Sequence, residues 1–116
     1  MKTIFFVEDD EALQDIALLV FTPPDFVVRV FCSAEDLLAE KSHPDVYVLD
    51  KQLPRMDGLT LCRLLKQGQL TKDIPVVVVS AAPDIKVLAA DAGADGSLEK
   101  PFSIRELVAV VERVHT

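Results

Sequence analysis

The sequence has little of several things that define other classes of protein. Its 116 residues include no tryptophan, two cysteines and four glycines. Two cysteines outside any Cys-x-x-Cys motif are too few for a disulfide framework or a cysteine-based metal site. We therefore expect Cys32 and Cys62 to be buried free thiols and the compartment to be reducing and cytoplasmic. No apolar run approaches the roughly 20 residues that span a membrane, and the first residues resemble a strand rather than a signal peptide.

Basic residues are also scarce. The chain has 12 Lys and Arg against 19 Asp and Glu, which gives a formal net charge of -7. Direct binding of nucleic acid needs a basic surface that meets phosphate, so this balance argues against it and favours cations or basic protein surfaces as partners. With 50% hydrophobic and 27% charged residues, the composition is that of a globular protein. We expect one domain over residues 1–116.

What the sequence does contain is a regular alternation of strand and helix patterns. Apolar runs predict five strands at Thr3–Val7, Val27–Phe31, Val46–Leu49, Val76–Val79 and Gly96–Glu99. The run Val76–Val79 is apolar on both faces, as in a parallel strand that helices cover on each side. Five strand–helix units with short connections predict an α/β fold with a central parallel sheet and helices on both faces.

Helix-start signals support the segments between the strands. We expect N-caps at Asp10 and Ser33, and Ser103–Glu106 has the form of a capping box. A third helix after Gly58 should bury Leu61, Leu64 and Leu65, and a fourth should cover Ile85–Ala92.

Polar residues follow four of the apolar runs. Asp50 ends the third run, Glu8, Asp9 and Asp10 follow the first, Ser80 follows the fourth, and Lys100 follows the fifth. In open α/β sheets ligands bind beyond the carboxyl ends of the strands, so these groups should converge at one edge.

Such an edge has a definite chemistry. Carboxylates that lie together repel one another unless a cation joins them, and Mg²⁺ prefers oxygen ligands. With the repulsion offset, Asp50 can attack phosphorus and form an aspartyl phosphate, while Lys100 supplies charge and Ser80 a hydroxyl donor. Taken singly, each residue has an ordinary explanation, for example Asp10 as a helix cap. The joint occurrence at four strand ends makes that explanation improbable.

The residues of this edge resemble the receiver domain of bacterial two-component response regulators. The resemblance covers essentially the whole chain, and the segments that carry it are Phe6–Asp10, Val48–Pro54, Met56–Gly58, Val79–Ala81 and Lys100–Phe102. It implies a flavodoxin-like sheet of order 2-1-3-4-5, a bacterial origin and a role in phosphorelay signalling. It also implies that the chain catalyses its own phosphotransfer and dephosphorylation and is not a turnover enzyme.

The resemblance further implies a role for each site residue. Asp50 would be the phosphoacceptor. Glu8 and Asp9, Asp50 itself and the backbone carbonyl of Gln52 would hold Mg²⁺, for which Mn²⁺ could substitute. Lys100 would pair with Asp50 and then with phosphate, and Ser80 would turn toward the phosphoryl group. The bond between Lys100 and Pro101 would be cis.

One position departs from the family pattern. Receivers usually carry Tyr or Phe three residues before the lysine, where this chain has Ser97. The family's aromatic side chain moves inward when the Ser or Thr engages phosphate, and a serine hydroxyl cannot report burial in that way. An alternative is therefore a constitutive protein-interaction module whose switching is impaired. A phosphatase or phosphotransferase enzyme would need a second acid placed for general acid work and a substrate-capping insertion, and neither is evident. Flavin binding would need a phosphate-cradling loop after the first strand, which this chain lacks.

The partners implied are a sensor histidine kinase or histidine phosphotransfer protein and a downstream protein or C-terminal output domain. A homodimer is a further possibility of the family, and the partner-binding face would comprise the fourth helix, fifth strand and fifth helix. No membrane partner is expected.

Overall fold

A computed structural model describes residues 1–115 and arranges five parallel strands there as one sheet of order β2-β1-β3-β4-β5. The strands are β1 (Lys2–Val7), β2 (Phe26–Phe31), β3 (Val46–Asp50), β4 (Val76–Ser80) and β5 (Gly96–Glu99). The helices are α1 (Glu11–Val20), α2 (Ala34–Leu38), α3 (Gly58–Gln67), α4 (Ile85–Asp91) and α5 (Ile104–His115). The predicted flavodoxin-like α/β fold is confirmed, with strand bounds that differ from the predicted ones by at most one residue.

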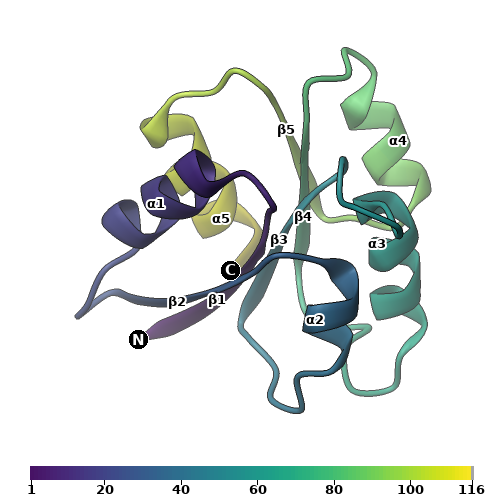
Figure 1. Cartoon of the computed structure of the whole chain (residues 1–116), viewed down its shortest axis with the longest axis horizontal. Coiled ribbons are helices and arrows are strands. Elements are labelled where there is room, and N and C mark those ends of the chain that lie inside the picture. Colours follow the sequence, from purple (N-terminus) through teal and green to yellow (C-terminus); the bar gives the residue numbers. More distant parts are fainter. Residues whose placement is uncertain (116) are drawn as a thin grey trace.

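The sheet lies between two layers of helices. Helices α1 and α5 cover one face, and α2, α3 and α4 cover the other (Figure 1). Successive strand residues point to opposite faces, so Phe5 and Val7 pack under α2 to α4 while Ile4 and Phe6 pack under α1 and α5. Helices cover both faces of the sheet at its centre, so β3 and β4 are buried along their whole length.

The predicted helix caps are present. The side chain of Asp10 accepts a hydrogen bond from the Ala12 amide at 2.9 Å, and Ser33 accepts one from the Asp36 amide at 3.1 Å. At α5 the two halves of the capping box are reciprocal, with Ser103 and Glu106 joined at 2.9 and 3.1 Å. These bonds satisfy amides that the first helical turn leaves without a partner.

Two predictions about burial are wrong. Leu64 is 41% exposed, because Leu61, Cys62 and Leu65 form the buried stripe of α3 and Leu64 lies outside one edge of that stripe at 100° per residue. Cys32 is exposed as well, because it follows Phe31 beyond the buried end of β2. Only Cys62 of the two is a buried thiol, and burial raises its pKa to about 11.

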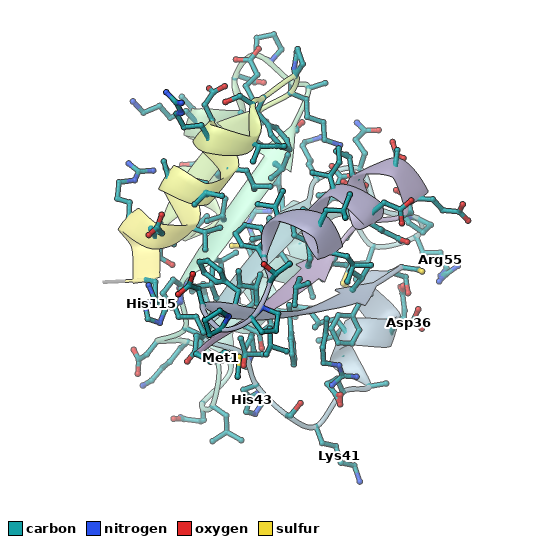
Figure 2. All side chains as sticks on the ribbon, turned by 90° about the vertical axis from the view of Figure 1, so that its left-hand side faces the viewer. Met1, Asp36, Lys41, His43, Arg55 and His115 are labelled. Carbon is teal, nitrogen blue, oxygen red and sulfur yellow. The ribbon has the colours of Figure 1, made fainter. Side chains whose placement is uncertain are left out.

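No helix within residues 1–115 is long and apolar enough to cross a bilayer. Polar side chains project from the surface between the elements. Figure 2 shows Lys41 and His43 on the α2–β3 connection, at the lower end of the molecule in that view.

Candidate functional site

The register of the sheet brings the predicted site residues together. In the β1–β3 pair Val7 is opposite Leu49, so Glu8 and Asp50 leave the sheet side by side. On the other side of β3, Asp50 is opposite Val79, and Ser80 is opposite Glu99. The residues after four parallel strands therefore meet at one edge, as the strand-end argument predicts.

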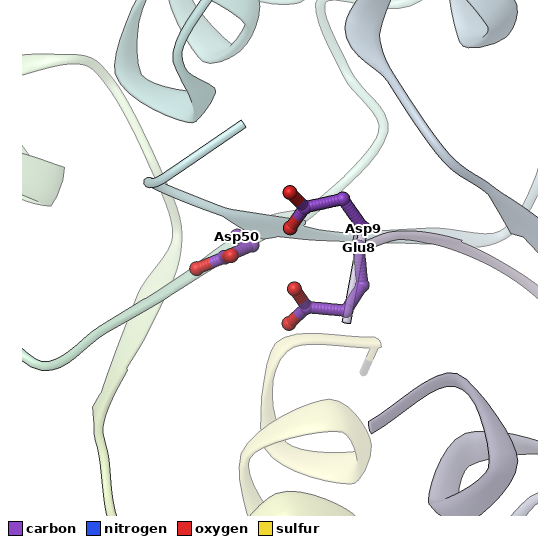
Figure 3. Close-up of side chains that lie close together, drawn as sticks. All are labelled: Glu8, Asp9 and Asp50. Atoms are coloured by element: carbon purple, nitrogen blue, oxygen red, sulfur yellow. The ribbon is translucent and has the colours of Figure 1, made fainter. Parts of the chain in front are cut away.

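Three carboxylates form the centre of this edge (Figure 3). Glu8, Asp9 and Asp50 each place one oxygen within 4.8 Å of the others. The side chains of Glu8 and Asp50 are buried, with 1% and 3% of each residue exposed, whereas Asp9 faces solvent. The cluster is thus closed on the protein side and open on one side.

Lys100 supplies the positive charge of the cluster. Its Nζ lies 3.3 Å from Asp50 Oδ1 and 3.4 Å from Glu8 Oε1. Burial alone would lower the pKa of this lysine, but the charges of Glu8 and Asp50 outweigh burial and raise it. Lys100 therefore stays charged and offsets one of the buried acids.

The remaining negative charge is visible in Glu8. Burial, and after it the hydrogen bond and charge of Asp50, raise the pKa of Glu8 to about 8. One lysine is therefore not enough to keep all three carboxylates ionised at neutral pH. An oxygen-only donor set with a solvent-facing side fits a hard cation such as Mg²⁺, which keeps several waters.

Gly58 allows α3 to start directly beside Asp50. A Cβ at this position would overlap the backbone oxygen of Asp50 and would lie 3.0 Å from Lys51 Cα. The Gly58 amide donates to the Lys51 carbonyl at 2.9 Å, which closes the loop after β3. Within residues 1–115, no hydrogen bond in this loop is accepted by the Gln52 carbonyl.

The remaining predicted residues lie on β4 and β5. Ser80 is buried at the end of β4, and its Oγ accepts a hydrogen bond from the Ala82 amide at 3.0 Å. Ser97 is half-buried in the middle of β5, away from the acids. The peptide bond between Lys100 and Pro101 is cis, as the resemblance implied.

Sequence reasoning missed one contributor to this edge. Gln14 of α1 donates from Nε2 to the Glu8 backbone oxygen at 2.5 Å and lies 3.6 Å from Cys32 Sγ. It thereby ties the loop that carries the acids to both α1 and the end of β2. The available signal was a polar residue between Leu13 and Ile16, on the half-buried side of α1.

A family model for the response regulator receiver domain matches residues 4–112. The chain belongs to the receiver domain family. The receiver is 36% identical to a protein from Chloroflexus aurantiacus assigned as a response regulator, with a TM-score of 0.92 over 98% of this chain and 97% of that one. The BeF₃-activated receiver domain of DrrB is 28% identical, with a TM-score of 0.86 over 98% of this chain and 97% of that one.

Curated relatives are longer than this receiver. The DNA-binding dual master transcriptional regulator RpaA of Synechocystis is 34% identical in an alignment 115 residues long that covers 96% of this chain and 48% of RpaA. The response regulator ArlR of Staphylococcus aureus is 34% identical in an alignment 118 residues long that covers 98% of this chain and 52% of ArlR. The receiver thus spans about half the length of these relatives.

Proposed function

We propose that this receiver accepts a phosphoryl group on Asp50 from a sensor histidine kinase or a histidine phosphotransfer protein, in a Mg²⁺-dependent reaction. The observation that carries the proposal is a buried carboxylate at 3.3 Å from a charged lysine, within a cluster of three carboxylates at the carboxyl edge of the sheet. A nucleophile, a cationic group and a set of oxygen ligands are what phosphoryl transfer to a carboxylate needs.

Each residue has a defined part in that reaction. A carboxylate oxygen of Asp50 attacks phosphorus, and the bond from phosphorus to the donor breaks with its electron pair leaving on the donor. The Nζ of Lys100 lies within reach of both Asp50 and Glu8. It would therefore pair first with the Asp50 carboxylate and then with the phosphoryl group transferred to it. Glu8, Asp9, Asp50 and the Gln52 carbonyl would hold Mg²⁺, which supplies further positive charge to the phosphoryl oxygens when bound.

Switching would begin at Ser80. Its hydroxyl oxygen now accepts from the Ala82 amide, and the hydroxyl would donate to a charged phosphoryl oxygen on Asp50 by turning toward it. A turn of this side chain would free the β4–α4 loop and so bias the face formed by α4, β5 and α5 toward a downstream protein or an attached output domain. Water would later hydrolyse the acyl phosphate and restore Asp50, releasing inorganic phosphate. Both steps act on the protein's own side chain, so the receiver would serve as a switch and not as a turnover enzyme for an external substrate.

Intact-mass measurement tests the acceptor residue. We expect the native chain, incubated with acetyl phosphate and Mg²⁺, to gain the mass of one phosphoryl group, and EDTA to prevent the gain. The Asp50→Asn variant should show no adduct, whereas Asp73→Asn, which changes an exposed acid, should behave as the native chain does. An equal adduct on Asp50→Asn would sink the proposal.

A second function is a constitutive interaction module that keeps the acidic site but does not switch. Ser97 favours this second function. The serine on β5 lacks the aromatic ring through which other receivers couple phosphorylation to their partner-binding face. Affinity for a downstream partner, or homodimerisation measured by sedimentation, decides between the two functions. Equal values with and without BeF₃⁻ would support the constitutive module, because a ligand with no differential affinity shifts no equilibrium.

A further inference from the structure

A hollow of about 250 Å³ lies between α2 and the carboxyl end of α3, far from the acidic cluster. The residues that line it come from α2, from the α2–β3 connection, from the start of β3 and from the end of α3 with the turn after it. An apolar cavity of about 150 Å³ holds a benzene molecule. This hollow therefore has room for one aromatic ring with a short chain attached.

The walls of the hollow are apolar and incompletely covered. Leu38 of α2 and Leu64 of α3 both line it, and they remain 47% and 41% exposed. The two leucines belong to different helices, so an occupant between them would remove apolar surface of both from water. The exposure of Leu64, which the pattern of α3 did not predict, thus coincides with a site that a ligand could fill.

Tyr47 brings an unused hydrogen-bonding group to this hollow. The residue is only 2% exposed, and its ring packs edge-on against Phe5 at 6.1 Å between centroids. Within residues 1–115 every side-chain oxygen that is sealed from solvent has a hydrogen-bond partner, whereas the Tyr47 hydroxyl has none, so this hydroxyl opens onto the hollow that Tyr47 lines. Burial raises the pKa of Tyr47 to about 12, so the hydroxyl stays protonated at neutral pH. A buried tyrosine hydroxyl usually has a partner, and here the partner would have to come from a ligand or from water.

The mouth of the hollow is basic, in a chain with a net charge of -7. Glu40 lines it but is already paired with Arg29 at 2.6 Å. His43 lines it from the α2–β3 connection, and Lys41 lies between two lining residues on the same connection (Figure 2). Neither His43 nor Lys41 forms an ion pair in the part of the chain that the structure describes. An anionic group at the mouth would therefore meet positive charge that no acid of the protein offsets.

We propose that this hollow binds a small phenolic carboxylic acid, with its hydroxyl on Tyr47, its ring between the two exposed leucines and its carboxylate beside the basic residues at the mouth. The phenol satisfies the buried hydroxyl, while the carboxylate stays in contact with water and loses little hydration. Apolar walls with a few well-placed polar groups are the usual form of a small-ligand site. Tyr47 lies near the amino end of β3 and Asp50 at its carboxyl end, so occupation of the hollow does not require phosphorylation.

An NMR titration of the native chain tests the site. The probe is phloretate, a phenol joined to a carboxylate by two methylene groups. We expect saturable shifts of the backbone amides of Leu38, Tyr47 and Leu64, with a dissociation constant of about 1 mM or lower, as suits a ligand of this size. Tyramine, which carries an ammonium group in place of the carboxylate, should not bind. Shifts that do not saturate, or that centre on the acidic cluster, would overturn the proposal.

The role of the Tyr47 hydroxyl has its own test. Hydrocinnamate is phloretate without the hydroxyl, and we expect the native chain to bind it about tenfold more weakly because a hydrogen bond inside the hollow is lost. Tyr47→Phe keeps the ring and removes the protein's hydroxyl, so it should bind the two ligands equally. Equal affinity of the native chain for both ligands would overturn the assignment of Tyr47. Circular dichroism would verify that the variant is folded.

Matched variants locate the ligand on the protein. Leu64→Glu places a carboxylate on the wall of the hollow and should abolish binding of phloretate, because it repels the ligand and removes apolar surface. Leu19→Glu makes the same exchange at a 78% exposed position of α1 and should leave the affinity unchanged. Equal weakening by the two variants would overturn the location. A dimer that shifts the same amides without phloretate would assign the hollow to a second copy of the chain and overturn the proposal.

Discussion

The two ends of the sheet use charged residues in opposite ways. At the carboxyl end three carboxylates share Lys100, at 3.3 and 3.4 Å from the nearest two. At the amino end Lys66 Nζ binds Asp95 at 2.7 Å and the Ile74 carbonyl at 2.9 Å, and the same Asp95 oxygen accepts from the Val76 amide at 2.9 Å. At the carboxyl end the negative charge of three carboxylates exceeds the positive charge of Lys100. At the amino end one cation and one anion balance each other and form short hydrogen bonds.

This difference shows which charges serve stability. The contacts of Lys66 and Asp95 join α3 to the starts of β4 and β5, so their removal leaves polar groups without partners. The acids of the other end keep their repulsion until a cation arrives. Carboxylates that repel one another at one edge of an otherwise well-bonded sheet are typical of a functional site.

At a fixed pH, loss of the amino-end contacts should have the largest effect of any single substitution. Lys66→Met should lower the free energy of unfolding by about 2 kcal/mol, because the Ile74 carbonyl and Asp95 lose a charged donor. Lys41→Met, at an exposed position, is the control. Urea unfolding measures both, with and without Mg²⁺. If the comparison holds, Mg²⁺ restores none of the loss in Lys66→Met, whereas it restores much of the loss in Lys100→Met.

The pH dependence of stability should come from the carboxyl end. The pKa of Glu8 rises from 4.5 to about 8 on folding, so the folded state favours the protonated acid. Its contribution is fully present below pH 4.5 and is lost as the pH rises toward 8, with a slope of at most about 1.4 kcal/mol per pH unit. Without metal, the free energy of unfolding should therefore fall more steeply with pH between these values in the native chain than in Glu8→Gln.

A matched variant isolates that slope from other titrations. Asp9, Asp50 and Lys100 surround Glu8, and all three remain in Glu8→Gln. Glu112→Gln removes an exposed acid of α5 and should keep the native slope. Identical slopes in the native chain and both variants would show that the pKa of Glu8 is not raised by its neighbours at the carboxyl end.

Removal of a carboxylate at this end should stabilise the protein. We expect Asp50→Asn to raise the metal-free free energy of unfolding by about 1 kcal/mol at pH 9, where Glu8 is ionised and repels Asp50, because the amide removes that repulsion and keeps the shape of the side chain. Asp73→Asn, near the amino end, should change it little. Thermal unfolding in EDTA compares the two, and a lower stability of Asp50→Asn would contradict the assignment of strain to this edge.

How much of this was predictable depends on the range of the interactions. Parallel strands in register bring the residues after them to one edge, so Asp50, Glu8 and Lys100 could be grouped from strand ends alone. Leu64 was assigned wrongly because the buried stripe of α3 depends on how the helix is rotated against the sheet. Tyr47 belonged to a predicted strand, but the hollow that it lines depends on the positions of α2 and α3.

The sequence analysis did not identify Gln14 as a contributor to the site, and its substitution has the smallest expected effect. Its hydrogen bond to the Glu8 carbonyl joins α1 to the loop that holds the acids. Gln14→Met keeps the length of the side chain and removes the donor, so we expect Mg²⁺ to bind about threefold more weakly, as a fraction of one hydrogen bond allows. Gln67→Met makes the same exchange at an exposed position of α3 and should leave the affinity unchanged. Calorimetric titration with MgCl₂ measures both, and equal affinities would mean that the acids are positioned by the sheet register without help from α1.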